Sequence, residues 1–107
     1  MSVLQQQQLP LDRAIFGEVL ACIPEGWTRV QLDASIRETS AAETTMALSL
    51  LGMGQAGVAV VSDRLQGEVR RLFLLNERFN TNLRGIMYTY EQKPDGRWSF
   101  SATYEYA

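Results

Sequence analysis

The sequence predicts a two-layer α+β domain: an antiparallel sheet of about five strands with two helices on one face, in the order α-β-β-β-α-β-β. Two segments, residues 10–23 and 63–80, repeat apolar side chains at the spacing of an amphipathic helix. Other segments alternate apolar and polar residues with a period of two, which is typical of strands with one buried face. A chain of 107 residues has room for one hydrophobic core, so we expect one domain.

The composition is that of an ordinary globular protein, with 46% hydrophobic and 21% charged residues. The net charge of −2 and an isoelectric point near 5.0 argue against nucleic acid as a partner, because binding to phosphates requires a cationic surface. No apolar stretch approaches the roughly 20 residues that cross a bilayer, and no signal peptide is visible. We therefore expect a cytoplasmic protein that binds no membrane. Histidine is absent and Cys22 is the single cysteine, so we expect neither a disulfide within the chain nor a metal site.

The first helix is expected from Pro10 to Ile23, after a flexible polar lead-in formed by residues 1–9. The folded domain then spans residues 10–107. Proline suits the first turn of a helix, and Pro24 cannot continue the helix. The apolar side chains gather on one side at helical spacing: Leu11, Ile15, Phe16, Val19, Leu20, Cys22 and Ile23.

Two strands are expected next, from Thr28 to Ile36 and from Thr44 to Leu51, joined by a connector at residues 38–43. Alternate residues in each strand are apolar, which predicts one face toward the core and one toward solvent. These apolar residues are Val30, Leu32, Ala34, Ile36, Met46, Leu48 and Leu50. A third strand is expected at residues 58–61, because most of them are β-branched.

Three glycines between these strands, Gly52, Gly54 and Gly57, match the G-x-G-x-x-G spacing of dinucleotide-binding loops. Such a loop leads into a helix whose N-terminus receives the pyrophosphate. Here the β-branched residues 58–61 follow, and they favour a strand. We therefore interpret the glycines as a hairpin connection with positive φ angles, and we expect no cofactor.

The second helix is expected from Asp63 to about Asn80, beginning with a variant of the capping box formed by Asp63 and Gln66. Leu74 points away from the core side and is a potential contact for a partner. The core side carries Leu65, Val69, Leu72, Phe73 and Phe79. The opposite side, which we interpret as a solvated face, carries Arg64, Arg71 and Arg78.

The last quarter of the chain is expected to form a β-hairpin around the turn Lys93–Gly96, where proline suits the second position of a type I turn. If Lys93 faces Arg97, the register of the whole hairpin follows. It pairs Tyr90 with Phe100, Tyr88 with Ala102 and Ile86 with Tyr104. One face is therefore aromatic, and we expect it to lie under the two helices.

We find no constellation of catalytic residues and expect no enzymatic activity. No serine or cysteine has a histidine partner, and Glu91 and Glu105 share a face but lie near opposite ends of the hairpin. The outer sheet surface remains as a rigid platform for a partner protein. It carries Arg29, Asp33, Arg37, Glu91, Ser99, Ser101, Thr103 and Glu105.

Three stretches resemble the YezG-like immunity protein family. The first is LACIPEGWTRVQLDASI, Leu20–Ile36, with a helix end, I-P-x-x-W and then a strand. The second is the long amphipathic helix Asp63–Asn80 after the predicted hairpin, and the third is the final hairpin with alternating aromatics, DGRWSFSATYEYA, Asp95–Ala107. IPEGW is the distinctive motif among them.

The resemblance implies a small cytoplasmic protein that binds and neutralises a cognate secreted antibacterial toxin, often a nuclease, without enzymatic activity. An acidic inhibitor can imitate the phosphate backbone in a cationic nuclease site. The family supplies no toxin-binding motif to transfer. Predicted exposure selects these candidates for contact with the toxin: Glu38, Glu43, Glu91, Asp95 and Glu105.

Two alternatives remain open. A small acidic secretion chaperone has a similar order of elements, and it would bind an effector segment as a dimer through apolar grooves. An enzyme or ligand-binding domain would use the tyrosine-rich face for a ring-shaped ligand, although such a face more often forms part of a core. A homodimer stays open under either interpretation.

Overall fold

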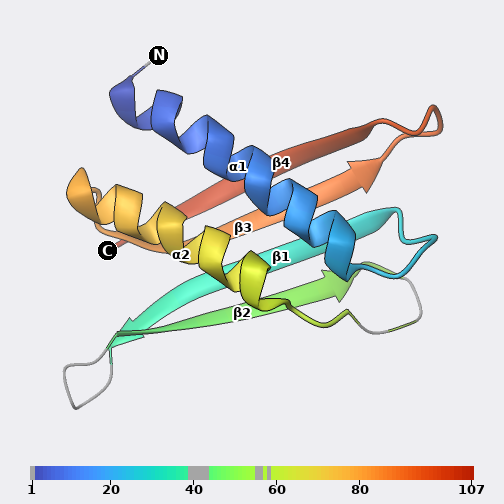
Figure 1. The fold of residues 1–107 in the computed structure, drawn as a ribbon, viewed down its shortest axis with the longest axis horizontal. Coiled ribbons are helices and arrows are strands. Elements are labelled where there is room, and N and C mark those ends of the chain that lie inside the picture. The colour runs from blue at the N-terminus through green and yellow to red at the C-terminus, as the bar shows by residue number, and fades with distance from the viewer. Residues whose placement is uncertain (1, 39–43, 55–56, 58) are drawn as a thin grey trace.

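Both helices lie on one face of a single four-stranded antiparallel sheet (Figure 1). The computed structural model describes residues 2–38, 44–54, 57 and 59–107, without the side chains at 38 and 44. The elements are α1 (Val3–Cys22), β1 (Arg29–Glu38), β2 (Thr44–Gly52), α2 (Asp63–Arg78), β3 (Leu83–Gln92) and β4 (Trp98–Tyr106). The strand order is β2-β1-β3-β4. The predicted two-layer α+β class is confirmed.

The prediction of about five strands is wrong, since residues 59–61 form no strand and residue 58 lies outside the described residues. β1 already pairs with β2 on one side and β3 on the other, so this segment could join the sheet only at an outer edge, beside β2 or β4. It instead leads from the end of β2 to α2. Ala59 and Val61 pack against the core, whereas Val60 is 76% exposed. In this segment every second side chain is buried, as in a strand, but its backbone pairs with no strand of the sheet.

Gly52 ends β2, and Gly54 and Gly57 lie in the connection from β2 to α2, so the hairpin expected there is not formed. Gly54 and Gly57 have positive φ angles of 72° and 113°, as predicted, whereas the positive φ expected at Gly52 is not found. A helix does follow the glycines, but the sheet is antiparallel and lacks the parallel β-α-β unit of a dinucleotide-binding fold. The first turn of α2 also contains Asp63, a negative charge at the position where a phosphate would bind.

Helix α1 begins at Val3 rather than at Pro10, so its predicted start is wrong. A capping box explains the earlier start. The hydroxyl of Ser2 accepts a hydrogen bond from the backbone N–H of Gln5 at 3.1 Å, and the Gln5 side chain accepts one from the Ser2 N–H at 3.0 Å. Pro10 therefore lies inside the helix, where it lacks the N–H that would bond to the carbonyl of Gln6.

Helix α2 is capped by Ser62, whose hydroxyl accepts a hydrogen bond from the Leu65 N–H at 3.1 Å. The predicted cap was Asp63, one residue later. At the other end the helix stops at Arg78. Phe79 was expected on the core side, but it is 39% exposed and lies outside the core. Leu74 is 53% exposed and points away from the core, as predicted.

The predicted register of the C-terminal hairpin is confirmed. The backbone N–H of Lys93 donates to the carbonyl of Arg97 at 2.7 Å. The pairs that follow are Tyr90 with Phe100, Tyr88 with Ala102 and Ile86 with Tyr104. The aromatic face lies on the helix side, but Phe100 at the edge of the sheet stays 53% exposed.

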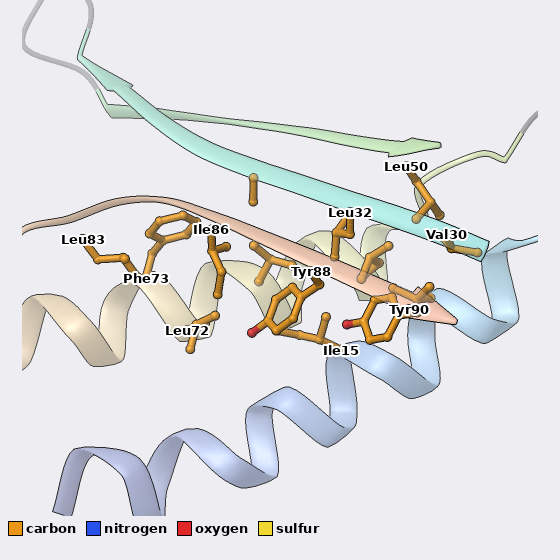
Figure 2. Close-up of a cluster of buried hydrophobic side chains, with 14 of the residues drawn as sticks. Ile15, Val30, Leu32, Leu50, Leu72, Phe73, Leu83, Ile86, Tyr88 and Tyr90 are labelled. Carbon is orange, nitrogen blue, oxygen red and sulfur yellow. The ribbon is translucent and has the colours of Figure 1, made fainter. Parts of the chain in front are cut away.

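The core fills the space between the helices and the inner face of the sheet (Figure 2). Leu32 of β1 and Tyr88 of β3 are paired in register, and both are fully buried. Ile15 of α1 and Leu72 of α2 pack into the same cluster. Burial of one such side chain contributes about 1.5–3 kcal/mol, so this layer supplies most of the driving force for folding.

Trp27 closes one end of the core and is 6% exposed. Its indole ring lies against Gly52 at the end of β2, where an added Cβ atom would come within 3.0 Å of three ring carbons. Position 52 therefore requires glycine, because the ring leaves no room for a side chain.

We predict that Gly52→Ala destabilises the protein by about 1–3 kcal/mol, because the buried indole ring cannot move away without disturbing the core. Chemical denaturation followed by far-UV circular dichroism measures the change. Gly17→Ala in α1 is the matched control, since nothing lies within 4 Å of a Cβ there. This control should stabilise the helix by about 0.5–1 kcal/mol. Equal effects of the two changes would contradict the packing argument.

Candidate functional site

The face of the sheet opposite the helices is uncovered in the described structure (Figure 1). We call it the open face. The strand registers and the alternation of side chains assign these residues to it: Arg29, Gln31, Asp33, Ser35, Arg37, Thr45, Ala47, Ser49, Leu51, Gly85, Met87, Thr89, Glu91, Ser99, Ser101, Thr103 and Glu105. Most of these side chains are small, so the surface is close to the backbone and has little conformational freedom to lose on binding.

A shallow hollow of about 510 Å³ lies in the open face, over all four strands. The register places Asp33 at one end of the hollow, beside Ser49 on β2 and Met87 on β3, and Arg37 at the other end. The charged residues that line the hollow are Asp33, Arg37 and Glu105, so carboxylates outnumber the guanidinium group. Gln31 orients Asp33 by donating a hydrogen bond from its side-chain amide at 2.9 Å. The hollow therefore suits a cationic group of a partner.

The other charges of the open face contribute little to its stability. Arg29 and Glu91 form an ion pair with 4.0 Å between Nε and Oε2, and both side chains are more than half exposed. Exposed pairs of this kind contribute about 0–1 kcal/mol, because water and salt screen them. Their positions leave both groups accessible to a partner.

Three of the five acidic residues that the sequence selected can be placed, and they lie apart. Glu105 lines the hollow, whereas Glu91 lies at the other end of the same hairpin, opposite Ser99. Asp95 lies in the turn, where its carboxylate accepts a hydrogen bond from the Arg97 N–H at 3.0 Å. Two candidates cannot be placed: Glu43 and the side chain of Glu38 lie outside the described residues.

A polar cluster lies on the other side of the sheet, beneath α1. The Tyr88 hydroxyl donates a hydrogen bond to Oδ1 of Asp12 at 2.5 Å. Burial raises the pKa of Asp12 above its ordinary value of 3.8, and the bond from Tyr88 partly offsets this rise. Burial also raises the pKa of Tyr88 and Tyr90, and it raises the pKa of Tyr104 to about 12. These tyrosines are therefore neutral at physiological pH.

Two members of this cluster have different hydrogen-bonding states. The Tyr104 hydroxyl accepts a hydrogen bond from the Gln8 side chain at 2.7 Å. The Tyr90 hydroxyl is buried and has no hydrogen-bond partner in the described part of the protein. Most buried polar groups in proteins are paired, so this exception asks for an explanation.

From the sequence, Asp12 was expected only to lie in the first turn of a helix, because that helix was expected to begin at Pro10. Its contact with Tyr88 was not predicted. A spacing signal was present: Ile15 and Phe16 stand three and four residues after Asp12, which places the three side chains on one face of a helix. Gln8 was missed for the same reason, since it fell in the expected lead-in.

No protein-family model matches the sequence, and no curated protein shows significant similarity to it. Within the described residues, no group of three or more histidine, cysteine, aspartate or glutamate side chains is placed to hold a metal ion. No described helix is both long enough and apolar enough to cross a membrane.

We predict that Tyr88→Phe destabilises the protein by about 1–3 kcal/mol, because it removes the hydrogen bond from a partly buried carboxylate. Tyr90→Phe is the matched control. It removes a buried hydroxyl that has no partner, so stability should stay within about 0.5 kcal/mol of the wild type or increase. Thermal and urea unfolding of both variants measure the difference. A larger loss for Tyr90→Phe than for Tyr88→Phe would contradict the assignment.

The raised pKa of Asp12 predicts a pH-dependent contribution to stability. The folded state keeps the proton of Asp12 to higher pH than the unfolded state, so this group favours folding below 3.8 and loses that contribution as pH rises through the folded-state pKa. Asp12→Asn lacks this titration. We expect the stability of Asp12→Asn relative to the wild type to increase with pH across this acid range. Urea unfolding of both proteins at several pH values measures this difference. A difference in unfolding free energy that stays the same at every pH would contradict the prediction.

Proposed function

We propose that the protein is a non-enzymatic immunity protein that binds the folded domain of a cognate secreted antibacterial toxin and blocks it. The observation that carries the proposal is the open face with its acidic hollow, lined by Asp33 and Glu105. A cationic enzyme surface, such as that of a nuclease, is the complementary partner. The resemblance of the stretches around IPEGW, α2 and the last hairpin to immunity proteins supports the same class.

The dimensions and rigidity of the open face suit such a partner. A specific interface buries about 800 Å² on each protein. The molecule measures 42 by 35 Å along its two longer axes, the plane seen in Figure 1, so the sheet layer offers an area of this order. Its strands are held by the core behind them, so binding requires little ordering of this surface.

We predict that Asp33→Arg weakens binding to the toxin domain by about tenfold or more, because it reverses one of the two negative charges that line the hollow. The test uses the C-terminal domain of a secreted protein encoded next to this chain, with calorimetry for affinity and co-expression for protection of cells. Glu77→Arg makes the same charge change on α2, in the helix layer, and should leave binding unchanged. Glu77 is exposed, whereas Asp33 is half-buried on the open face, so circular dichroism checks that both variants are folded.

Two outcomes contradict the proposal. One is continued cell death when the wild-type protein is co-expressed with the toxin domain. The other is an equal loss of affinity for Asp33→Arg and Glu77→Arg, which would show that the toxin does not bind specifically to the open face.

A secretion chaperone is the second candidate, and the edge strand β2 favours it. Residues Thr44–Gly52 contain no charged residue and no proline, the features with which proteins commonly protect an edge from pairing with another chain. An extended effector segment could add to this edge as a fifth strand. A chaperone would bind an unfolded segment of its partner, whereas the proposed immunity protein binds one folded domain in a one-to-one complex. Size-exclusion chromatography with the folded and with the unfolded partner distinguishes these two functions, because it shows which form of the partner co-elutes with the protein.

A further inference from the structure

A recess of about 230 Å³ lies between α1 and the hairpin formed by β3 and β4. It lies on the helix side of the sheet, away from the open face. We call it the aromatic recess. Its walls include Asp12, Arg13, Phe16, Tyr90, Trp98 and Phe100.

Four aromatic rings surround the recess. Phe16 of α1 lies 5.3 Å from Tyr90 and 6.0 Å from Trp98, measured between ring centroids. Tyr90 lies 6.0 Å from Phe100 on the neighbouring strand. The faces of aromatic rings carry partial negative charge, so rings grouped around a recess attract a cation.

A buried polar atom at the recess lacks a partner. Tyr90 is 1% exposed, and its hydroxyl has no hydrogen bond within the described chain. Figure 2 shows the rings of Tyr88 and Tyr90 side by side on β3. Tyr88 uses its hydroxyl on Asp12, whereas the hydroxyl of Tyr90 is closed off from the recess, so Tyr90 contributes its ring to the walls.

Asp12 supplies a carboxylate with spare acceptor capacity. Its Oδ1 accepts the hydrogen bond from Tyr88, and no ion pair joins Asp12 to a cation among the described residues. Burial disfavours its charged form and raises its pKa. A bound cation would stabilise the carboxylate and replace part of the lost hydration.

We propose that the aromatic recess binds a small organic cation, a primary alkylammonium group. Its N–H groups would donate to Asp12, and its alkyl chain would lie against the rings of Phe16, Tyr90, Trp98 and Phe100. The recess is smaller than the roughly 300–1,000 Å³ of most ligand pockets, which selects a compact group. The proposal does not depend on the function assigned to the open face.

The charges around Asp12 set the expected selectivity. Arg13 lies on the rim, is exposed, and is the like charge that opposes a cation. From the sheet, Tyr88, Tyr90 and Tyr104 face this region as neutral groups. Asp12 is thus the group whose protonation governs binding, and affinity should fall as pH is lowered through its pKa.

The test is an NMR titration of the full chain with n-butylammonium chloride, which also reproduces a lysine side chain. The indole N–H of Trp98 should shift in a saturable way, with a Kd on the order of 1 mM or tighter. Trp27 lies outside the recess and serves as the internal reference. The matched neutral probe is 1-butanol, which should bind much more weakly.

Four variants locate the site. Asp12→Asn should weaken binding by about tenfold or more, because it removes the negative charge that faces the ammonium group. Tyr90→Phe keeps the ring and removes only a hydroxyl that is closed off from the recess, so it should bind as the wild type does. Arg13→Gln should bind equally well or more tightly, since a like charge is removed. Asp33→Asn, the same change as Asp12→Asn but on the open face, should have no effect. Circular dichroism checks that each variant is folded, and the pH dependence of the wild type tests Asp12 without any mutation.

Several results would overturn the proposal. They are the absence of a saturable shift at Trp98, equal affinity for 1-butanol, weaker binding by Arg13→Gln, and equal losses for Asp12→Asn and Asp33→Asn. A second titration, with Nα-acetyl-lysine N-methylamide, identifies the source of the group. If both cations bind, the recess accepts the ammonium group of a lysine side chain on a protein. If only butylammonium binds, the recess is restricted to free amines.

Discussion

Burial of one face of the sheet is the constraint on which the rest of the structure depends. The strands alternate apolar and polar residues, so the sheet has one apolar face that must leave water. Helices α1 and α2 cover that face, with Ile15 and Leu72 packing against Leu32 and Tyr88. The described residues form two helices and both lie on this side, which leaves the other face open. The surface proposed for toxin binding therefore exists because the core is built on one side of the sheet.

The same layer contains polar groups whose arrangement is more demanding than hydrophobic packing. Asp12 enters the helix–sheet interface and is satisfied by Tyr88, while Gln8 satisfies Tyr104. These contacts position α1 over β3 and β4 more specifically than apolar contact alone can do. The unpartnered Tyr90 hydroxyl is the exception in an otherwise paired cluster, and it lies beside the aromatic recess. Two chemically distinct surfaces, one on each side of the sheet, thus share strand β3 as their common support.

The candidate site was predictable only in part. Alternation along β1, β3 and β4 identified the open face and several of its residues, Asp33 and Glu105 among them. It could not show that these two line one hollow, because that depends on the pairing of β1 with β3 and of β3 with β4. Three of the acidic residues chosen for predicted exposure, Glu91, Asp95 and Glu105, are spread over the hairpin and its turn, since exposure of single residues carries no information about their mutual distance.

What the sequence by itself determined is local: the amphipathic face of α2, the alternation of the strands, and the register of the last hairpin, which follows from a tight turn next to alternating residues. Tertiary structure decided the strand order β2-β1-β3-β4, the number of strands and the role of Asp12. Residues 59–61 show the reason: their pattern suits a strand, but the edges available to them and the path to α2 leave them unpaired. Strand pairing and burial are contacts between segments far apart in the chain, so a local pattern permits them without specifying which ones form.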